Sequence, residues 1–466
     1  MSIRDVNWGI LLTEKCEKTS VLNEKLLTPE LQGKALESLR SRNPLRAEDW
    51  RYTNLKTFSD VEFSGIDYQE TSWEVIEKDN SGSRVDSNSL RICTLSELAQ
   101  QNRDSLAQDA WSWISEQMKA EDALTQLQTL HLQDGLVLLV AEGEDGGDVY
   151  LTRSKNEFHF STSMLNLDTP NLWVYLAPRA KLSIHESYGE MGVEQQTSEL
   201  AEGEESHKLT LGLTGLYLSE SSNLSYLRSQ TETRQLEQES NYHLARVSSI
   251  LRKQAELKVI SLNLGSDLCR LELDVSLEES EAKADLNGLY LGSGTTQLDQ
   301  HLILRHKAPN CSSAQRFKGA FGGRSKGIFT GRVIVAKGAS QTRADQNNPN
   351  LLLSTKAKAI TRPQLEIYND EVECSHGATA GQLDEDALFY LKARGMNEAS
   401  ALRALTSAFV GELREQVIEP RLTKAIDMAL WQALELHPNE VVLGEEWLDW
   451  TELDQALEDS NQTLES

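Results

Sequence analysis

The stretch Gln254-Ala255-Glu256-Leu257-Lys258-Val259 decides the fold, because its pattern returns several times along the middle of the chain. In each copy a small or polar residue precedes a segment in which apolar and polar side chains alternate. Alternation with a period of two predicts a β-strand with one buried face. Three further copies are Arg179-Ala180-Lys181-Leu182-Ser183-Ile184, Ser222-Asn223-Leu224-Ser225-Tyr226-Leu227 and Glu281-Ala282-Lys283-Ala284-Asp285-Leu286. Their spacing is irregular, so they indicate a loose solenoid repeat.

The β-rich character extends over residues 134–379, beginning at Gly135-Leu136-Val137-Leu138-Leu139-Val140. Short apolar segments are separated there by Gly, Ser, Asn and Asp, and helical periodicity is nearly absent. A β-solenoid and a β-sandwich both fit this pattern. A sandwich of this length normally divides into two domains, and no linker is evident, so we favour the β-solenoid.

Residues 1–133 are predicted to be mainly helical. Thr28-Pro29-Glu30 has the form of a helix start, with Thr as the N-cap and Pro in the first turn. A second amphipathic run covers Leu95 to Leu132, and a polar loop is expected at residues 78–90.

Residues 380–438 are predicted to form a C-terminal helical domain. Asp384 is expected to cap a first helix that ends at Gly395, and Asn397 a second that stops at Pro420. A third is expected from about Leu422 to Leu436.

The second of these helices carries an apolar stripe that includes Leu405, Phe409 and Leu413. Two or three helices cannot bury all their apolar stripes among themselves, so part of this surface must meet the β region or another protein. Residues 439–466 follow as an acidic tail, with nine acidic residues and no Lys or Arg.

The chain is strongly acidic, with 72 Asp and Glu against 46 Lys and Arg and a net charge of −26 over 466 residues. Such a charge repels phosphate backbones, so a nucleic-acid partner is not expected. No apolar run is long enough for a membrane helix, and no signal peptide is evident. We therefore expect no membrane association and a cytoplasmic location.

The five cysteines, Cys16, Cys93, Cys269, Cys311 and Cys374, are far apart and form no CxxC pair. A complete local zinc or iron–sulfur site is thereby excluded, and a reducing compartment is indicated. A phosphate loop of the form GxxxxGK[ST] is also missing, so the chain is not expected to hydrolyse nucleotides. The glycine-dense segment 319–331, with Lys318, Arg324 and Lys326 nearby, fits tight turns better than an anion site.

Cys374 and His376 form the most informative pair, at the end of the β region. Residues two apart on a strand share a face, so both side chains are predicted to project the same way. A thiolate beside an imidazole suits iron or zinc, and the imidazole can also activate the thiol. Spacing alone equally allows a buried cysteine and a hydrogen-bonded histidine that only end the last strand.

Several motifs resemble the SufB/SufD family of the SUF iron–sulfur cluster assembly system. Near the N-terminus the motif is Pro44-Leu45-Arg46-Ala47-Glu48-Asp49-Trp50-Arg51-Tyr52-Thr53. Towards the C-terminus the motifs are Ala344-Asp345-Gln346-Asn347-Asn348-Pro349-Asn350-Leu351-Leu352-Leu353-Ser354, Gln364-Leu365-Glu366-Ile367, Cys374-Ser375-His376-Gly377-Ala378-Thr379 and Leu388-Phe389-Tyr390-Leu391-Lys392-Ala393-Arg394-Gly395. They lie in order near both ends of the chain, and they look more like the SufD than the SufB branch.

The resemblance implies a right-handed parallel β-helix core flanked by helical regions. It implies a scaffold subunit that is not an enzyme, pairs with a SufB-like paralogue, and binds a SufC-like ATPase through the C-terminal helices. Leu405, Phe409 and Leu413 are the candidate ATPase contacts. A transient iron–sulfur cluster would form at the partner interface, near the candidate residues His376 and Cys374, with ligands shared with the partner. Arg46 and Trp50 are interpreted first as fold-stabilising, and flavin binding stays undetermined.

Two alternatives remain. In one, the chain only stabilises a SufB-like partner, and Cys374 and His376 do no chemistry. In the other, it is a β-solenoid carbohydrate-active enzyme that uses Asp345, Glu366 and Asp370. Nothing in the sequence groups these three carboxylates.

Overall fold

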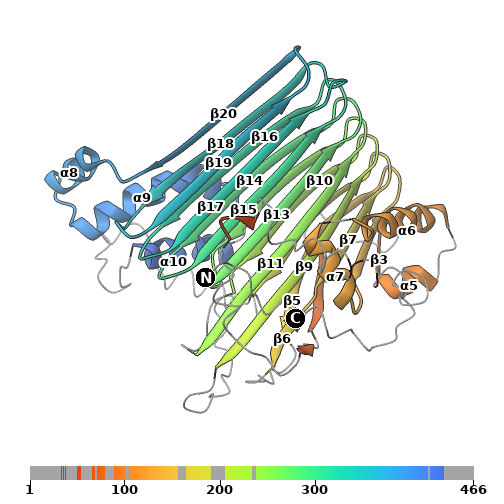
Figure 1. Ribbon diagram of the computed structural model, residues 1–466, viewed down its shortest axis with the longest axis horizontal. Coiled ribbons are helices and arrows are strands. Elements are labelled where there is room, and N and C mark those ends of the chain that lie inside the picture. Colours follow the sequence, from red (N-terminus) through yellow and green to blue (C-terminus); the bar gives the residue numbers. More distant parts are fainter. Residues whose placement is uncertain are drawn as a thin grey trace.

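In the computed structural model the described residues are 33, 35, 37, 50–53, 66–68, 71–78, 89–100, 104–120, 122–155, 164–189, 205–232, 238–417 and 420–434. Their core is a parallel β-solenoid built from two sheets (Figure 1). From β7 to β20 the chain alternates between the sheets, so that neighbours within a sheet come from successive coils. The prediction of a β-solenoid is confirmed, and the sandwich alternative is wrong.

The first sheet has the order β19-β17-β15-β13-β11-β9-β7-β4-β3, with β6 pairing β9 and β1 pairing β6. Its strands are β1 (Ile66–Tyr68), β3 (Leu90–Thr94), β4 (Leu136–Val140), β6 (Leu165–Asp168), β7 (Asn171–Leu176), β9 (Ser206–Leu218), β11 (Glu239–Leu251), β13 (Leu268–Leu277), β15 (Gln297–His306), β17 (Lys326–Val335) and β19 (Lys358–Ile367).

The second sheet has the order β2-β5-β8-β10-β12-β14-β16-β18-β20. Its strands are β2 (Thr71–Lys78), β5 (Asp145–Lys155), β8 (Lys181–Tyr188), β10 (Asn223–Gln230), β12 (Glu256–Asn263), β14 (Lys283–Gly292), β16 (Ser312–Phe321), β18 (Thr342–Leu352) and β20 (Val372–Gly381).

The repeated sequence pattern marks one turn of each coil. In each copy the residue before the small buried one has a positive φ and donates its backbone N–H to the next coil, as Gln254 does to Ser280 O. This residue is the first of the quoted segment in three copies, and Ser221, just before the segment, in the copy at Ser222. The residue after it is small and buried, because it points into the coil corner. The positive-φ residues at this turn are Arg179, Ser221, Gln254, Glu281, Asn310 and Gln341, and the small residues after them are Ala180, Ser222, Ala255, Ala282, Cys311 and Thr342.

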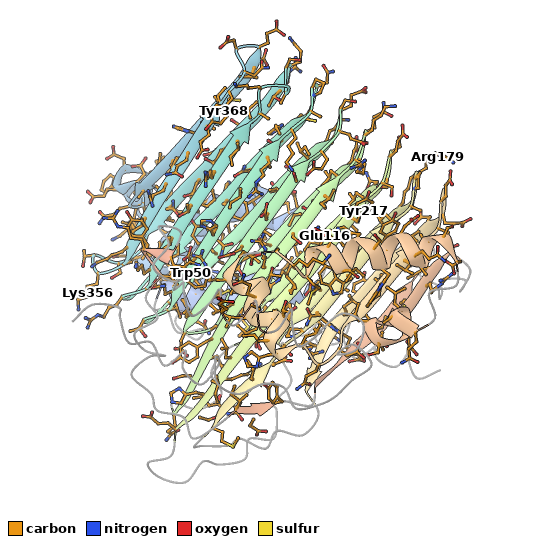
Figure 2. The ribbon with its side chains drawn as sticks, turned by 45° about the vertical axis from the view of Figure 1, so that its right-hand side comes forward. Trp50, Glu116, Arg179, Tyr217, Lys356 and Tyr368 are labelled. Atoms are coloured by element: carbon orange, nitrogen blue, oxygen red, sulfur yellow. The ribbon has the colours of Figure 1, made fainter. Side chains whose placement is uncertain are left out.

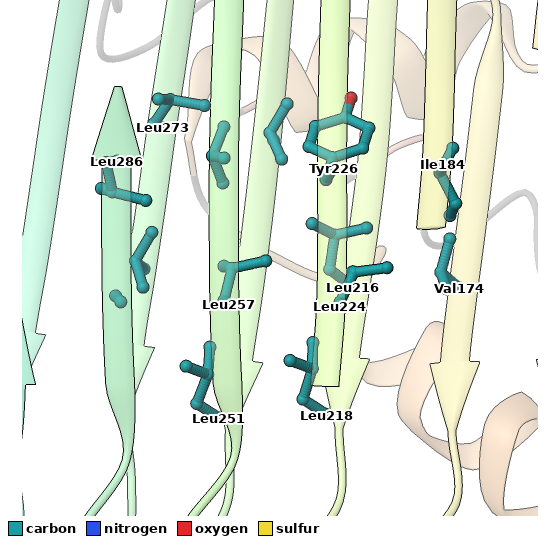
Figure 3. Close-up of a cluster of buried hydrophobic side chains, with 14 of the residues drawn as sticks. Val174, Ile184, Leu216, Leu218, Leu224, Tyr226, Leu251, Leu257, Leu273 and Leu286 are labelled. Atoms are coloured by element: carbon teal, nitrogen blue, oxygen red, sulfur yellow. The ribbon is translucent and has the colours of Figure 1, made fainter. Parts of the chain in front are cut away.

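Aliphatic side chains from the two sheets meet inside the solenoid and form its main core. In the region of Figure 3, Leu224 and Leu257 of the second sheet face Leu216 and Leu251 of the first. Because residues one coil apart are in register, similar side chains stack in columns along the axis. Burial of these columns is the main source of stability in a fold whose coils contact only their neighbours.

Three N-terminal helices, α5 (Leu95–Gln100), α6 (Ser105–Gln117) and α7 (Ala123–His131), cover the outer face of the first sheet. They confirm the helical pattern predicted after Leu95. The region predicted to be mainly helical also contains β1, β2 and β3, which the sequence interpretation did not single out. The expected helix start at Thr28 lies outside the described residues, although residues 33, 35 and 37 are helical.

The short segment Trp50–Thr53 lies against the outer face of the first sheet (Figure 2). The Trp50 ring packs 4.0 Å from the guanidinium carbon of the buried Arg270, which donates to Thr53 Oγ1 at 3.1 Å. Thr53 also donates to Asp299 of β15. These contacts agree with a fold-stabilising role for Trp50, whereas Arg46 lies outside the described residues.

The C-terminal helices are α8 (Glu385–Ala393), α9 (Glu398–Arg414) and α10 (Pro420–Ala433). Asp384 and Asn397 cap α8 and α9 as predicted, and Gly395 follows α8 with φ +95°. Pro420 has a second role that was not predicted, because it begins α10. α9 and α10 pack on the outer face of the second sheet, whereas α8 projects beyond it (Figure 1).

Candidate functional site at the open end of the solenoid

The two ends of the solenoid differ. At the N-terminal end the sheets close with the antiparallel strands β2 and β3. At the C-terminal end, β19 and β20 each pair on one side only within the described residues; β20 is largely exposed and β19 is partly exposed. We call the surface of β19, β20 and the following Tyr368 the open end. A bare strand edge offers unpaired N–H and C=O groups to another chain.

Cys374 and His376 both lie on β20 at this open end. Their in-register neighbours on β18 are Ala344 and Gln346, which face the solenoid interior and are buried. The regular β20 strand therefore directs Cys374 and His376 towards the same, inner side, with their Cα atoms about 6.6 Å apart. Cys374 is half-buried and His376 is exposed, since no further coil in the described part of the chain covers them.

The Cys374 thiol packs against a small apolar cluster that contains Val333, Val335 and Ala344. Desolvation in this cluster raises the pKa of the thiol, although the backbone N–H of Ala344 opposes the shift. The thiol is therefore protonated at neutral pH. A metal ion or a cation from another chain would be needed to bring it to the nucleophilic thiolate.

The other described cysteines are not at the open end. Burial raises the pKa of Cys93 to about 11 and that of Cys269 to about 12. Cys269 donates to Asn263 Oδ1 at 3.3 Å inside the solenoid, and Cys311 fills the small-residue position of the coil turn. Both therefore have structural positions. Among the described residues, no three His, Cys, Asp or Glu side chains are grouped so that they could hold a metal ion.

The carboxylates of the carbohydrate-enzyme alternative are not brought together. Asp345 of β18 lies on the outer face of the second sheet and accepts a hydrogen bond from Ser375 Oγ. Glu366 of β19 lies on the outer face of the first sheet and pairs with Arg332 at 2.6 Å. A paired-carboxylate mechanism needs the two groups within about 10 Å on either side of one bond, which this placement on opposite faces does not offer.

The glycine-dense segment 319–331 contains a tight turn between β16 and β17, in agreement with its interpretation from the sequence. Lys318 Nζ donates to Phe409 O at 3.0 Å and to Glu412 at 3.2 Å, so it holds helix α9. A Cβ at Gly322 would lie 1.6 Å from Ala433 O, so only glycine lets the end of α10 approach this turn.

A shallow groove of about 880 Å³ crosses the uncovered part of the second sheet and ends at Cys374 and Ser375. Sequence reasoning missed it, because it is formed by outward side chains of strands from six coils. Its charges neutralise one another in pairs such as Lys283–Glu256 and Arg343–Glu373, so its charge favours no particular ligand.

The three candidate ATPase contacts on α9 are not equally accessible. Leu413 is only 2% exposed, in the cluster that joins α9 and α10 to the second sheet. Phe409 packs against the same cluster, and Leu405 is partly exposed. The body of this chain therefore already covers Leu413.

An apolar surface on α8 was not singled out from the sequence. This helix has no buried residue, and Phe389 and Tyr390 are 73% and 56% exposed. Met396, just after the helix, is 40% exposed. We call Phe389, Tyr390 and Met396 the α8 face. The sequence of the motif Leu388–Gly395 could have indicated this surface. It has more apolar residues than a single helix stripe packed against α9 requires.

Among the described residues, the open end leaves strand edges accessible and the α8 face leaves apolar side chains accessible. The fold therefore defines a parallel β-solenoid protein with one accessible sheet end. Among the helices of the described part of the chain, none has the length and hydropathy needed to cross a membrane.

The chain belongs to the SufB/SufD family of the SUF iron–sulfur cluster assembly system. The model of that family, "SUF system FeS cluster assembly, SufBD core domain", matches residues 160–409. This match covers β6 to β20, α8 and most of α9.

Curated relatives agree with this assignment. An iron–sulfur cluster assembly SufBD family protein of Synechocystis is 26% identical over 423 residues, which cover 84% of this chain and 88% of the relative. The iron–sulfur cluster assembly protein SufD of Escherichia coli is 31% identical over 194 residues, or 42% of this chain and 46% of that protein. A SufBD family protein of Mycobacterium leprae is 31% identical over 196 residues. The chain thus aligns with about half the length of the last two relatives.

Proposed function

We propose that this chain is a SufD-type scaffold subunit of a SufBCD-type complex, which pairs with a SufB-like paralogue and binds a SufC-like ATPase. The observation that carries the proposal is the open end. Among the described residues, the other end is closed by antiparallel strands, and the outer edges of β19 and β20 have no strand paired to them. Exposed edge strands aggregate unless another chain or a covering segment protects them. A paralogue with the same fold offers matching edges for strand addition.

Apolar side chains next to these edges support docking at the open end. Ile367 and Tyr368 are 42% and 58% exposed, and Tyr368 lies towards the far end of the last strands (Figure 2). Aromatic residues of this kind are enriched among the residues that dominate binding energy. We infer that they are buried in the heteromeric complex.

The nascent iron–sulfur cluster is the cargo of this interface rather than a resident cofactor of the chain. His376 and Cys374 supply two adjacent donors on the inner side of β20, and the partner supplies the remaining ligands. His376 is the more available donor, because the Cys374 thiol is half-buried and has a raised pKa. The free thiols of the described cysteines fit the cytoplasm that we propose as the compartment.

The ATPase contact is assigned to the α8 face. Its side chains are accessible, whereas Leu413 and Phe409 pack against the second sheet. The ATPase supplies the nucleotide chemistry, and this chain transmits it to the solenoid through α9 and α10.

Co-expression with candidate SufB and SufC subunits tests the proposal. We expect a complex of defined mass that contains all three chains. The double substitution Ile367→Asp and Tyr368→Asp should release the SufB-like subunit while the ATPase stays bound. Ile76→Asp is the matched control, because Ile76 is an exposed apolar residue, 46% accessible, on the opposite end strand β2. Unchanged assembly by the double variant, or equal loss in the control, would contradict pairing through the open end.

A further inference from the structure

One inward column of the second sheet changes character as it approaches the open end. Its members in register are Ile184, Tyr226, Val259, Leu286, Gln315, Gln346 and His376, from β8 to β20. The first four are apolar or aromatic, and the last three are polar. Solenoid packing alone does not require this change, because apolar side chains fill such columns at lower cost.

Gln346 holds a fixed position in this column. It is 1% exposed, and its Nε2 donates to Gln315 Oε1 at 2.7 Å. The same Nε2 occupies the space above Gly331 of β17, where an added Cβ would lie only 2.0 Å from it. The amide group is therefore held by β16 on one side and by β17 across the interior.

The carbonyl oxygen of Gln346 has no such partner. Its Oε1 is inaccessible to solvent and accepts no hydrogen bond from the residues that the structure describes. An unpaired buried acceptor costs free energy, and native proteins normally satisfy it. On β16, the Gln315 amide presents its oxygen to Gln346 Nε2, and its own Nε2 is also without a partner. The donor for Gln346 Oε1 is therefore expected from the other neighbouring strand, β20.

His376 is the residue in register on the next strand. It is paired with Gln346 in the β18–β20 ladder, about 4.8 Å away at the backbone. Its ring is exposed, and no hydrogen bond of this ring is recorded among the described residues. An imidazole can reach a glutamine oxygen over this spacing by rotating about its side-chain bonds.

We propose that Gln346 is a positioning residue that accepts one ring N–H of His376 and directs the other ring nitrogen towards the open end. An amide oxygen only accepts, so the ring nitrogen next to it must carry the proton. The other nitrogen then keeps its lone pair for iron or for a thiol proton. A hydrogen bond to the far nitrogen commonly fixes the tautomer of a ligating histidine in this way. The consequence for cluster assembly rests on the proposed role of His376, but the hydrogen bond itself does not.

The test is nuclear magnetic resonance of the full chain with ¹⁵N-labelled histidine rings, at a pH at which the ring is neutral. The His376→Ala variant assigns the His376 signals. We expect the wild-type ring to show one dominant tautomer, with one protonated and one unprotonated nitrogen shift. Gln346→Met should move both shifts towards the average of a freely exchanging ring, whereas Gln346→Glu keeps an acceptor and should keep a single tautomer.

Two variants serve as controls. Asn347→Met changes the next, outward-facing residue, and Thr361→Val removes another buried hydroxyl without a partner on β19. Neither control variant removes the acceptor beside His376, so both should leave the His376 ring signals unchanged. If Gln346→Met does not fold, Gly331→Ala displaces the same amide through the 2.0 Å contact and should change the tautomer ratio.

Identical His376 ring shifts in the wild type and in folded Gln346→Met would overturn the proposal, even if the variant is less stable. Loss of the single tautomer with full cluster assembly by the complex would support the hydrogen bond and count against the proposed role of His376. Loss of the single tautomer together with loss of cluster assembly would support both the hydrogen bond and the proposed role of His376.

Discussion

Phe389→Ala and Leu413→Ala are predicted to have opposite effects, although both residues are apolar and lie in the C-terminal helices. Leu413 is 2% exposed within the cluster that fixes α9 to the second sheet. Its truncation should lower the free energy of unfolding by about 2–5 kcal/mol, because a cavity remains. Phe389 is 73% exposed, so its truncation should change stability by less than about 0.5 kcal/mol.

Affinity for the ATPase subunit should be lowered more by Phe389→Ala than by Leu413→Ala, the reverse of the effect on stability. If Phe389 becomes buried in that contact, removing its ring should cost about 1.5–3 kcal/mol, or about 10–150-fold in Kd. Leu413→Ala should bind with nearly wild-type affinity at a temperature at which it is folded. Denaturant unfolding measures the first quantity, and titration calorimetry with the purified ATPase subunit measures the second.

Ile76→Asp provides the control for a change to an exposed apolar residue far from α8. Unchanged affinity of Phe389→Ala, together with loss of binding by a folded Leu413→Ala protein, would refute this reasoning. In that case α9 would have to leave the second sheet when the partner binds.

Three further outcomes are expected. His376→Ala should change the free energy of unfolding by less than about 0.5 kcal/mol, because the ring is exposed. The iron and sulfide content of the assembled complex should fall, and a full cluster content would favour a purely structural role for His376. Trp50→Ala should destabilise the chain by about 3–5 kcal/mol in denaturant unfolding, because the ring is 5% exposed over Arg270, and an unchanged midpoint would show that this contact contributes little. Burial lowers the pKa of His306 to about 4 from an ordinary 6.5, so the folded protein keeps this ring neutral. The neutral ring contributes about 3 kcal/mol at most to the free energy of unfolding, and this contribution is complete above pH 6.5 and is lost as the pH falls towards 4. His306→Gln should therefore reduce the slope of stability against pH between 6.5 and 4, and an equal slope in both proteins would contradict this assignment.

Local signals in the sequence were sufficient for the elements that local chemistry controls. Period-two alternation after residues such as Gln254 and Glu281 identified strands of successive coils, because each inward position meets the same core. Asp384 and Asn397 were recognisable as caps, because a cap acts on N–H groups two or three residues away. The shared face of Cys374 and His376 follows from strand geometry in the same way.

Other features depended on residues distant in the sequence, and no local pattern contained them. The contact of Thr53 with Asp299 joins segments 246 residues apart, and β2 and β3 close the N-terminal end only after the solenoid exists to pair with them. Whether Leu413 faces the body or a partner depends on how α9 docks on the second sheet.

Sequence patterns were therefore enough to favour the solenoid over a sandwich and to predict the flanking helices and the Cys374–His376 pair, because these depend on periodicity and on neighbours a few residues apart. Three features became evident only in three dimensions: the open end, the accessibility of α8 in contrast to Leu413, and the position of Gln346 beside His376. The physical reason is that strand register and helix docking are set by packing between coils about 30 residues apart, and such packing leaves no periodic trace in either segment alone.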